Sequence, residues 1–175
     1  MYWPGTLALA RGGREEVGLM PILTMLREFL EVNNVPYSVH SHPEAYTAQE
    51  IAALQHVKGR SLAKVVIVKA GASLVMLVLP ADHQVEFEKL KTVLGLKDVR
   101  LAREDEFRNV FPGSDVGAMP PFGNLFGLAV YADSSLARTD DIVFNAGTHT
   151  LTTKVAFRDF VSLVKPVMAD FAVHL

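Results

Sequence analysis

The sequence predicts a single α+β domain with a mixed β-sheet curled into a barrel. The chain has 175 residues, of which 50% are hydrophobic and 21% charged, and these values are typical of one domain with a large interior. Some strand-like runs follow each other directly as hairpins, and others are separated by helices, so strands and helices do not alternate strictly along the chain. This order favours an α+β fold. We expect residues 20–175 to form the domain and residues 1–19 to be an N-terminal extension, with Met20 as the native start.

Periodicity and capping predict the first three elements. Pro36 ends the first helical pattern, and residues 37–40 alternate as in a short strand. The run TAQE at residues 47–50 is a capping box, so a second helix is expected to begin there and to end near residues 58–60. The first helix is predicted by apolar residues at helical spacing, namely Ile22, Leu23, Leu26, Phe29 and Leu30.

The middle of the chain predicts a buried hairpin followed by a helix. Two apolar runs, residues 64–68 and 74–79, are the expected strands of the hairpin. A helix over residues 85–94 follows, and Gly95 ends it as a C-terminal cap. A short strand at residues 99–101 and a short helix at residues 104–110 are expected next.

The last third of the chain predicts three strands and a closing helix. The strands are expected at residues 128–131, 142–144 and 151–157. The helix is expected from residue 159 to residue 172, with a kink or a split at Pro166.

Composition excludes several classes of function. The chain has no cysteine, which excludes disulfides, cysteine-ligated zinc and thiol catalysis and fits a cytoplasmic location. No apolar run reaches the roughly 18 residues of a membrane-spanning helix, so no membrane partner is expected. The net charge of −2 provides no overall basic field, so DNA is not expected as a partner and any contact with nucleic acid must be local.

One histidine cluster is a candidate metal site. His40 and His42 alternate on a predicted strand and therefore share a face, and Glu44 follows them. No third ligand stands at a familiar spacing, so a strand end at the surface is the favoured interpretation. The G-x-S-x-G elbow and the Walker and Rossmann phosphate motifs are also absent.

Three further features have both a structural and a functional interpretation. Lys64 opens an apolar strand, so its ammonium either reaches the surface or points into a pocket. The run DVGAMPPFGN at residues 115–124 is either a corner or a loop whose rigid backbone amides bind an anion or a carbonyl. The run FNAGTH at residues 144–149 is either a hairpin turn or a polar pocket wall.

Together and in this order, these features resemble the YbaK and prolyl-tRNA synthetase-associated editing domain family, whose members deacylate mischarged tRNA. The resemblance extends from Met20 to Ala172 through YSVHSHPEAYTAQEIA, GRSLAKVVIVK, DVGAMPPFG and IVFNAGTHTLTTKVAFRDFVSLVKP. Residues 117–121 match the family's G-x-x-x-P loop, and Lys64 matches its strand lysine. The family loop often has serine before its proline, where this chain has Met119-Pro120, and this difference leaves the edited amino acid open.

The resemblance implies a compact domain with a barrel-like mixed sheet ringed by helices, and an activity that hydrolyses the ester of mischarged tRNA, usually alanyl- or cysteinyl-tRNA(Pro). It implies no metal, no other cofactor and no covalent nucleophile, because water attacks with help from a tRNA hydroxyl. The partners it implies are the 3′ acceptor end of the tRNA and an aminoacyl-tRNA synthetase. The alternative is a non-catalytic module of the same fold that binds a tRNA end, a nucleotide or a synthetase.

The resemblance also assigns roles to individual residues. The catalytic set is Lys64, Gly117 and Pro121, in which Lys64 holds the terminal phosphate or sugar and the loop amides orient the aminoacyl carbonyl. The expected phosphate contacts are Lys58 and Arg60. The remaining expected substrate-binding residues are Ala118, Met119, Pro120, Phe122, Gly123, Asn145, Gly147, Thr148 and His149.

Overall fold

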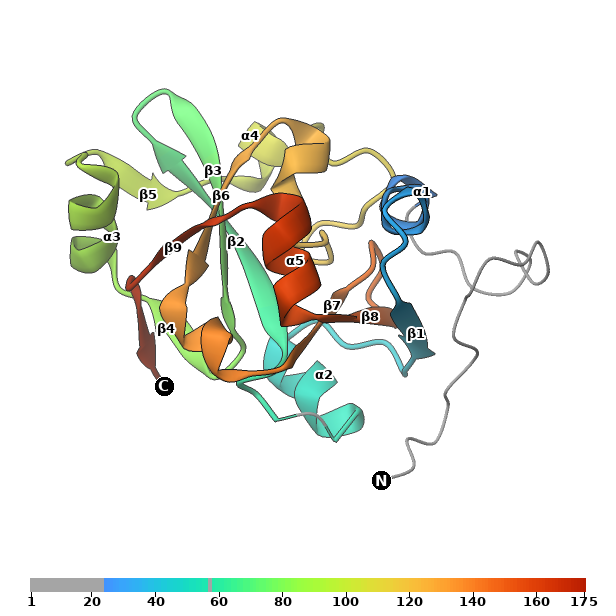
Figure 1. Cartoon of the computed structure of the whole chain (residues 1–175). Helices are drawn as coiled ribbons and strands as arrows, with labels where there is room; N and C mark the ends of the chain where they lie inside the picture. The colour runs from blue at the N-terminus through green and yellow to red at the C-terminus, as the bar shows by residue number, and fades with distance from the viewer. Residues whose placement is uncertain (1–23, 57) are drawn as a thin grey trace.

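Three β-sheets form the framework of the protein (Figure 1), whose computed structural model describes residues 24–56 and 58–175. The central sheet has the order β5-β2-β3-β6-β9, and a second sheet has the order β1-β8-β7. The third sheet pairs β10 with β4. The strands are β1 (Tyr37–Ser41), β2 (Ala63–Ala70), β3 (Ser73–Pro80), β4 (His83–Val85), β5 (Val99–Leu101), β6 (Ala129–Asp133), β7 (Asp141–Asn145), β8 (Leu151–Ala156), β9 (Val167–Ala169) and β10 (Ala172–His174).

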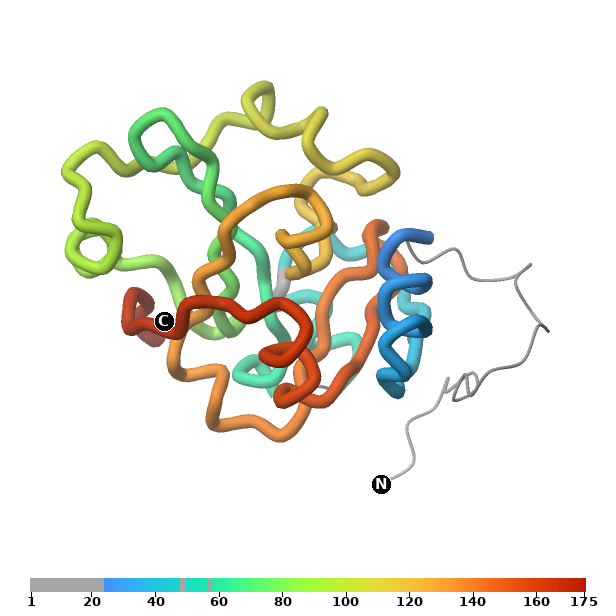
Figure 2. The backbone as a smooth tube through the Cα atoms, turned by 45° about the horizontal axis from the view of Figure 1, so that its top comes forward, coloured from blue at the N-terminus to red at the C-terminus, as the bar shows by residue number. Residues whose placement is uncertain are grey.

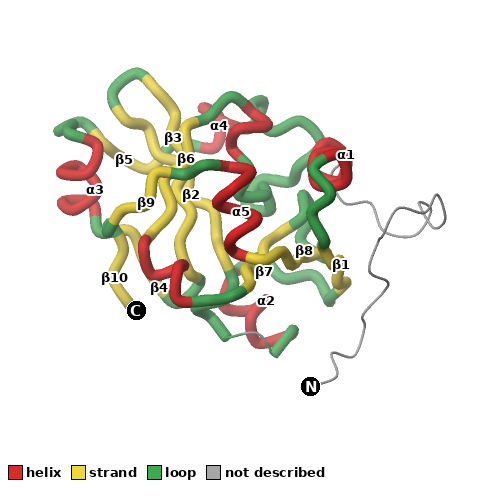
Figure 3. Tube along the Cα trace, in the orientation of Figure 1, coloured by secondary structure: helices red, strands yellow, loops and turns green. Residues whose placement is uncertain are grey.

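Helices cover both faces of the central sheet (Figures 1 and 3). Leu90 of α3 packs with Val68 of β2 and Leu77 of β3 on one face. On the other face, the larger hydrophobic cluster joins β2, β3 and β6 to the inner face of the β1-β8-β7 sheet and to α1 and α5. The α-helices are α1 (Thr24–Val32), α2 (Ala48–Leu54), α3 (Phe87–Leu94), α4 (Glu104–Phe107) and α5 (Phe157–Val164), and the 3₁₀ turns are η1 (Gly123–Phe126) and η2 (Ser134–Arg138).

The central sheet is mixed, as predicted. β2 pairs antiparallel with β3 and β5, whereas β6 runs parallel to both β3 and β9. The α+β fold class is confirmed, but the strands of the described residues form three separate sheets, so the expected closure into a barrel is wrong. Figure 2 shows the β1-β8-β7 sheet to one side of the central sheet, next to α1.

Local signals placed most elements correctly. The capping box is present, because the Glu50 amide donates to Thr47 Oγ1 at 3.2 Å and the Thr47 amide donates to Glu50 Oε2 at 3.0 Å. The predicted hairpin is β2-β3, with all eight residues of each strand in register. Gly95 ends α3 with φ of +66°, a left-handed conformation that glycine adopts without strain.

The predicted C-terminal helix is wrong beyond Val164. Lys165 has φ of +50° and Pro166 follows it, so the helix ends and the chain continues as β9 and β10. The carboxylate of Asp133 accepts hydrogen bonds from the Phe171 and Ala172 amides at 3.0 and 2.9 Å, which fixes this turn against the end of β6.

Four other helix boundaries also differ from the prediction, among them the start of α5, which lies at Phe157 and not at residue 159. Val85 belongs to β4, and α3 begins after Glu86, whose carboxylate accepts from the amides at positions 88 and 89. The helices α2 and α4 end at Leu54 and Phe107, earlier than expected. The proposed extension over residues 1–19 and the start at Met20 lie outside the described residues. No helix within the described ranges has the length and apolar character needed to span a membrane.

Candidate functional site

Hydrogen bonds join the G-x-x-x-P loop to the turn between β7 and β8. The Asp115 amide donates to the Gly147 carbonyl at 2.8 Å, and the Gly147 amide donates to the Ala118 carbonyl at 2.9 Å. Asn145 Nδ2 donates to the Gly117 carbonyl at 3.4 Å. Two segments about 30 residues apart in sequence therefore form one unit, which we call the loop–turn site (residues 115–123 and 144–149).

Two glycines give the loop–turn site its backbone shape. Gly117 has φ of +85° and Gly147 has φ of +98°, values that a side chain strongly disfavours. A Cβ atom on Gly117 would lie 3.5 Å from His149 Cε1, which is an ordinary contact. Strain from a substitution at Gly117 would therefore come from the backbone angle and not from lack of space.

Few amides in the loop remain available to a ligand. Pro120 and Pro121 have no N–H group, and the Ala118 amide donates to the Asp115 carbonyl at 3.0 Å. The Gly117 amide faces Met119 Sδ at 3.2 Å, and a thioether is a weak acceptor that a substrate oxygen can replace. The Met119 amide has no hydrogen-bond partner within residues 24–56 and 58–175. The expected amide group is thus reduced to positions 117 and 119.

Other predicted site residues pack in the core. The Phe122 ring is fully buried, with ring centroids 5.4 Å from Phe144 and 5.8 Å from Phe160. A Cβ atom on Gly123 would lie 2.6 Å from Val130 Cγ2, so glycine is required there by packing. Both residues hold the loop in position, and neither presents a polar group.

Buried polar atoms without partners mark the lining of the loop–turn site. Asn145 Oδ1 and His149 Nδ1 are inaccessible and form no hydrogen bond within the described chain. His149 Nε2 lies 3.1 Å from the Val116 carbonyl, and Thr148 Oγ1 lies 3.3 Å from Thr150 Oγ1. Unsatisfied buried polar atoms are destabilising, and they are rare except where a ligand or water completes them.

Sequence reasoning missed a polar pair next to this lining. Thr152 lies opposite Asn145 in the β7-β8 register, and its hydroxyl donates to Gln55 Oε1 at 2.8 Å. Gln55 Nε2 is buried and has no partner among the described residues. Gln55 follows α2 directly, and nothing in its neighbourhood in the sequence indicates that it is buried.

Lys64 is placed apart from the loop. Residues alternate between the two faces of a strand, so Lys64 shares a face of β2 with Val66 and Val68. The other face presents Ala63 and Ile67 to the cluster that includes Met119. Burial lowers the pKa of Lys64, and the charge of Asp82 offsets part of this effect. No hydrogen bond or ion pair joins Lys64 to the loop–turn site among the described residues.

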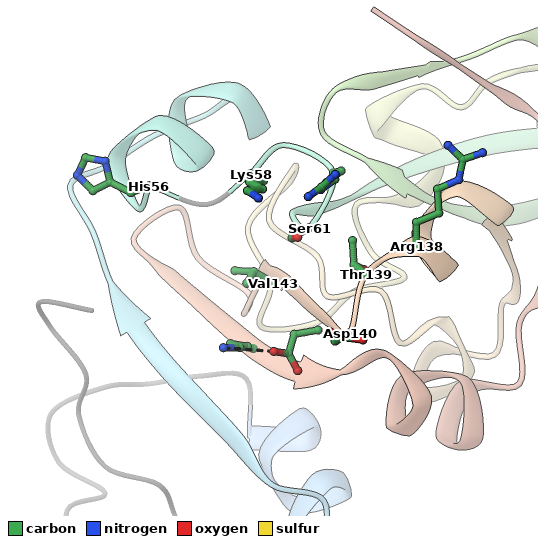
Figure 4. A pocket seen from close by; sticks show the side chains of 10 residues that line it. His56, Lys58, Ser61, Arg138, Thr139, Asp140 and Val143 are labelled. Carbon is green, nitrogen blue, oxygen red and sulfur yellow. Dashed lines mark ion pairs between the residues drawn. The ribbon is translucent and has the colours of Figure 1, made fainter. Parts of the chain in front are cut away.

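Lys58 and Arg60 line a groove of about 350 Å³, which we call the basic groove (Figure 4). Arg138 and Lys154, which sequence reasoning did not single out, line it as well. Lys154 Nζ lies 3.3 Å from Asp141 Oδ2. The full lining is His56, Lys58, Arg60, Ser61, Arg138, Thr139, Asp140, Asp141, Val143 and Lys154.

The two histidines of the candidate metal site are buried, so the favoured interpretation as a surface strand end is wrong. His40 is 4% exposed, with Nε2 3.0 Å from Ser38 Oγ, and burial followed by the charge of Lys154 lowers its pKa. His42 is 8% exposed, with Nδ1 2.7 Å from the Pro43 carbonyl. The described residues contain no group of three or more histidine, aspartate or glutamate side chains placed to hold a metal ion.

Comparisons with known proteins agree with the fold. The chain belongs to the aminoacyl-tRNA editing domain family, whose model matches residues 42–163. It is 34% identical over 105 residues to a proline–tRNA ligase of Thiobacillus denitrificans, which covers 59% of this chain and 18% of that enzyme. It is 30% identical over 121 residues to a proline–tRNA ligase of Staphylococcus saprophyticus, which covers 67% of this chain and 21% of that enzyme. The chain thus spans about a fifth of the length of these relatives.

Solved structures show the same fold. A candidate trans-editing enzyme for prolyl tRNA synthetase superposes with a TM-score of 0.76 at 19% identity, over 89% of this chain and 99% of that one. A hypothetical protein superposes with a TM-score of 0.76 at 24% identity, over 85% of this chain and 99% of that one.

Proposed function

We propose that this chain is a trans-acting aminoacyl-tRNA deacylase that hydrolyses the ester of mischarged tRNA, with alanyl- and cysteinyl-tRNA(Pro) as the expected substrates. The observation that carries the proposal is the loop–turn site of an editing-family chain. It holds two amides, at Gly117 and Met119, and two polar atoms, at Asn145 and His149, that have no partner among the described residues. A cytoplasmic location is expected from this function.

The chemistry requires little from the protein. Water attacks the ester carbonyl, a tetrahedral oxyanion forms, and the bond between the carbonyl carbon and the ribose oxygen breaks. The proton of the water passes by way of the neighbouring ribose hydroxyl to the leaving oxygen, giving a free amino acid and a free tRNA end. A donor aimed at the oxyanion contributes about 3–4 kcal/mol. The Gly117 amide can take this role once the carbonyl oxygen displaces Met119 Sδ.

Neither a metal nor another cofactor enters the proposed reaction. The ester is already activated, so positioning and electrostatic stabilisation provide the rate increase. Discrimination between amino acids by pocket size contributes about 1–3 kcal/mol per methylene group. The Met119 side chain, which stands where the family often has serine next to its proline, is the proposed source of that discrimination.

One observation favours the alternative, a non-catalytic module that binds a tRNA end or a synthetase. Lys64 lies on the face of β2 opposite the face that packs against the loop cluster, so the proposed catalytic set is divided between two faces. The relatives are prolyl-tRNA synthetases, so such an enzyme is the partner we propose for either function.

A panel of mischarged tRNAs, incubated with the purified chain and no synthetase, separates the two functions. The deacylase releases the amino acid from at least one member of the panel, at a rate proportional to protein concentration. Binding of tRNA without release from any member would refute the deacylase and support the module.

A further inference from the structure

The basic groove carries a local positive charge on an acidic protein. Four cationic side chains, those of Lys58, Arg60, Arg138 and Lys154, face two carboxylates, which gives a net charge of +2 with histidine neutral. The whole chain has a net charge of −2. Lys154 is paired with Asp141, whereas the other three cations have no ion-pair partner in the described part of the chain.

The backbone that presents these cations is fixed. The Val143 amide donates to the Ser61 carbonyl at 2.9 Å, and Leu62 forms a parallel bridge with Val143, so the segment bearing Lys58 and Arg60 is attached to β7. Arg138 ends η2, in which the Thr139 amide donates to the Leu136 carbonyl at 3.2 Å. Figure 4 shows Lys58 and Arg138 on either side of Ser61 and Thr139.

β7 connects the basic groove to the loop–turn site. Asp141 and Val143 line the groove, and Asn145, at the other end of the same strand, belongs to the loop–turn site. These three residues share one face of β7, and four steps of about 3.3 Å separate its ends by about 13 Å. One end of a polyanion bound in the groove therefore lies a short distance from the atoms proposed to hold the ester.

Lys64 is associated with the groove through Asp82. The charge of Asp82 acts on Lys64, and Asp82 also packs against Gly59, whose added Cβ atom would lie 3.1 Å from Asp82 Cβ. Gly59 stands between Lys58 and Arg60 in the sequence. Lys64 does not line the groove itself, so it is not counted among the cations of the groove.

We infer that the basic groove binds the phosphodiester backbone of the unpaired 3′ end of tRNA, and that Arg138 is a binding residue for it. The inference rests on the proposed function for the identity of the polyanion. Three cations that have no ion-pair partner in the described ranges, set in one groove, match a chain of single negative charges, which Lys and Arg contacts bind in a salt-dependent manner. Asp140, an exposed carboxylate without an ion-pair partner among the described residues, opposes this binding.

The first test measures binding and does not depend on turnover. The probe is a fluorescently labelled single-stranded RNA with the sequence of the tRNA(Pro) 3′ end, titrated by anisotropy at several salt concentrations. Arg138→Gln is expected to weaken binding about two- to fivefold, and to reduce the slope of log K against log salt by about 0.7. Asp140→Asn is expected to tighten binding by a similar factor, a gain that misfolding cannot produce. Lys97→Gln, which removes an exposed cation outside the groove, is expected to leave binding unchanged.

The second test connects the groove to the reaction. On a mischarged tRNA, Arg138→Gln raises KM and leaves kcat unchanged, because the contact is made equally in the ground state and the transition state. On an aminoacylated adenosine, which has no phosphodiester, the variant and the wild type react at the same rate.

The outcomes separate the two proposals. No measurable RNA binding, or binding that neither Arg138→Gln nor Asp140→Asn alters, overturns the groove whatever the activity of the chain. Binding that responds to both variants without deacylation of any tRNA supports the groove and refutes the deacylase. If Arg138→Gln weakens the binding of adenosine monophosphate by the same factor as it weakens the binding of RNA, the groove is assigned to free nucleotides instead.

Discussion

Replacing Lys64 by methionine is predicted to reduce activity while increasing stability. Lys64 is half-buried on β2 and lies opposite Leu79 in the register, so the cross-strand neighbour of this residue is apolar. Burial lowers its pKa, and the charge of Asp82 only partly offsets this effect, which means that the folded protein disfavours the cation. We therefore propose that Lys64 serves a ligand at the expense of the stability of the fold.

The expected loss of activity follows from the strength of one charged contact. A hydrogen bond to a charged group contributes about 1.5–3 kcal/mol, and about 1.4 kcal/mol corresponds to a factor of ten. Lys64→Met is therefore expected to lower kcat/KM about 10- to 150-fold. Methionine retains the length and most of the apolar stem of lysine, so packing against Leu79 is preserved.

The pH dependence of stability provides a second observable. The folded pKa of Lys64 lies below its unfolded value of about 10.5, so the unfolded chain binds more protons between the two values. The free energy of unfolding of the wild type consequently rises with pH in that window. The methionine variant lacks this term, so its stability advantage is largest near pH 7 and narrows towards pH 10.5.

Deacylation kinetics and urea unfolding at pH 7 and pH 10 measure these effects. Lys69→Met is the matched control, because Lys69 is half-buried near the other end of the same strand and away from Asp82. It is expected to leave kcat/KM within about twofold of the wild type. A Lys64→Met protein that is destabilised by more than about 1 kcal/mol at pH 7 with unchanged kcat/KM would refute the reasoning.

Three further predictions concern the loop and the C-terminal segment. Gly117→Ala places a side chain at φ of +85°, which costs about 1–2 kcal/mol of stability. The substitution is expected to lower kcat at least tenfold because it moves the amide. A variant with the kcat of the wild type would contradict a role for that amide. Met119→Leu removes the sulfur that faces the Gly117 amide and keeps the side-chain volume nearly constant. We therefore expect kcat/KM on the preferred substrate to stay constant or rise. A tenfold fall in kcat/KM would show that the sulfur itself is needed. Burial disfavours the ionised form of Asp133, but hydrogen bonds from Ser135, Phe171 and Ala172 outweigh it and lower the pKa. Asp133→Asn is therefore expected to reduce the free energy of unfolding by about 1–3 kcal/mol at pH 7. The stability that Asp133 contributes is present above its unfolded pKa of about 3.8 and is lost as pH falls through the lower folded value. The free energies of unfolding of the wild type and of Asp133→Asn are therefore expected to converge in acid. A constant difference between them from pH 7 to pH 3 would contradict this assignment.

Signals between near neighbours in the sequence predicted much of the fold. The capping box at Thr47, the β2-β3 hairpin and the cap at Gly95 each depend on residues within a few positions of one another. β9 and β10 depend instead on distant partners, because β9 pairs with β6 and Asp133 holds the amides that precede and begin β10. Periodicity cannot show those partners, so the sequence pattern extends the preceding helix beyond Pro166.

The candidate site, like the fold, has one part that the sequence predicts and another part that it does not. The resemblance to the editing family identified the loop at Gly117 and the turn at Asn145, and the structure brings the two together. Gln55 and Arg138 were missed, because the burial of Gln55 and the groove around Arg138 arise from chain segments that are distant in the sequence. The position of Lys64 on the opposite face of β2 follows from strand alternation only when the neighbours on each face are known.

The most direct test of the central claim is the release of alanine or cysteine from mischarged tRNA(Pro) by the purified chain in the presence of a metal chelator. A deacylase that acts through the loop–turn site is predicted to release the amino acid at the same rate with and without chelator, and to lose at least tenfold in rate when Gly117 is replaced by alanine. Release that stops in chelator, or no release from either substrate, would contradict the claim.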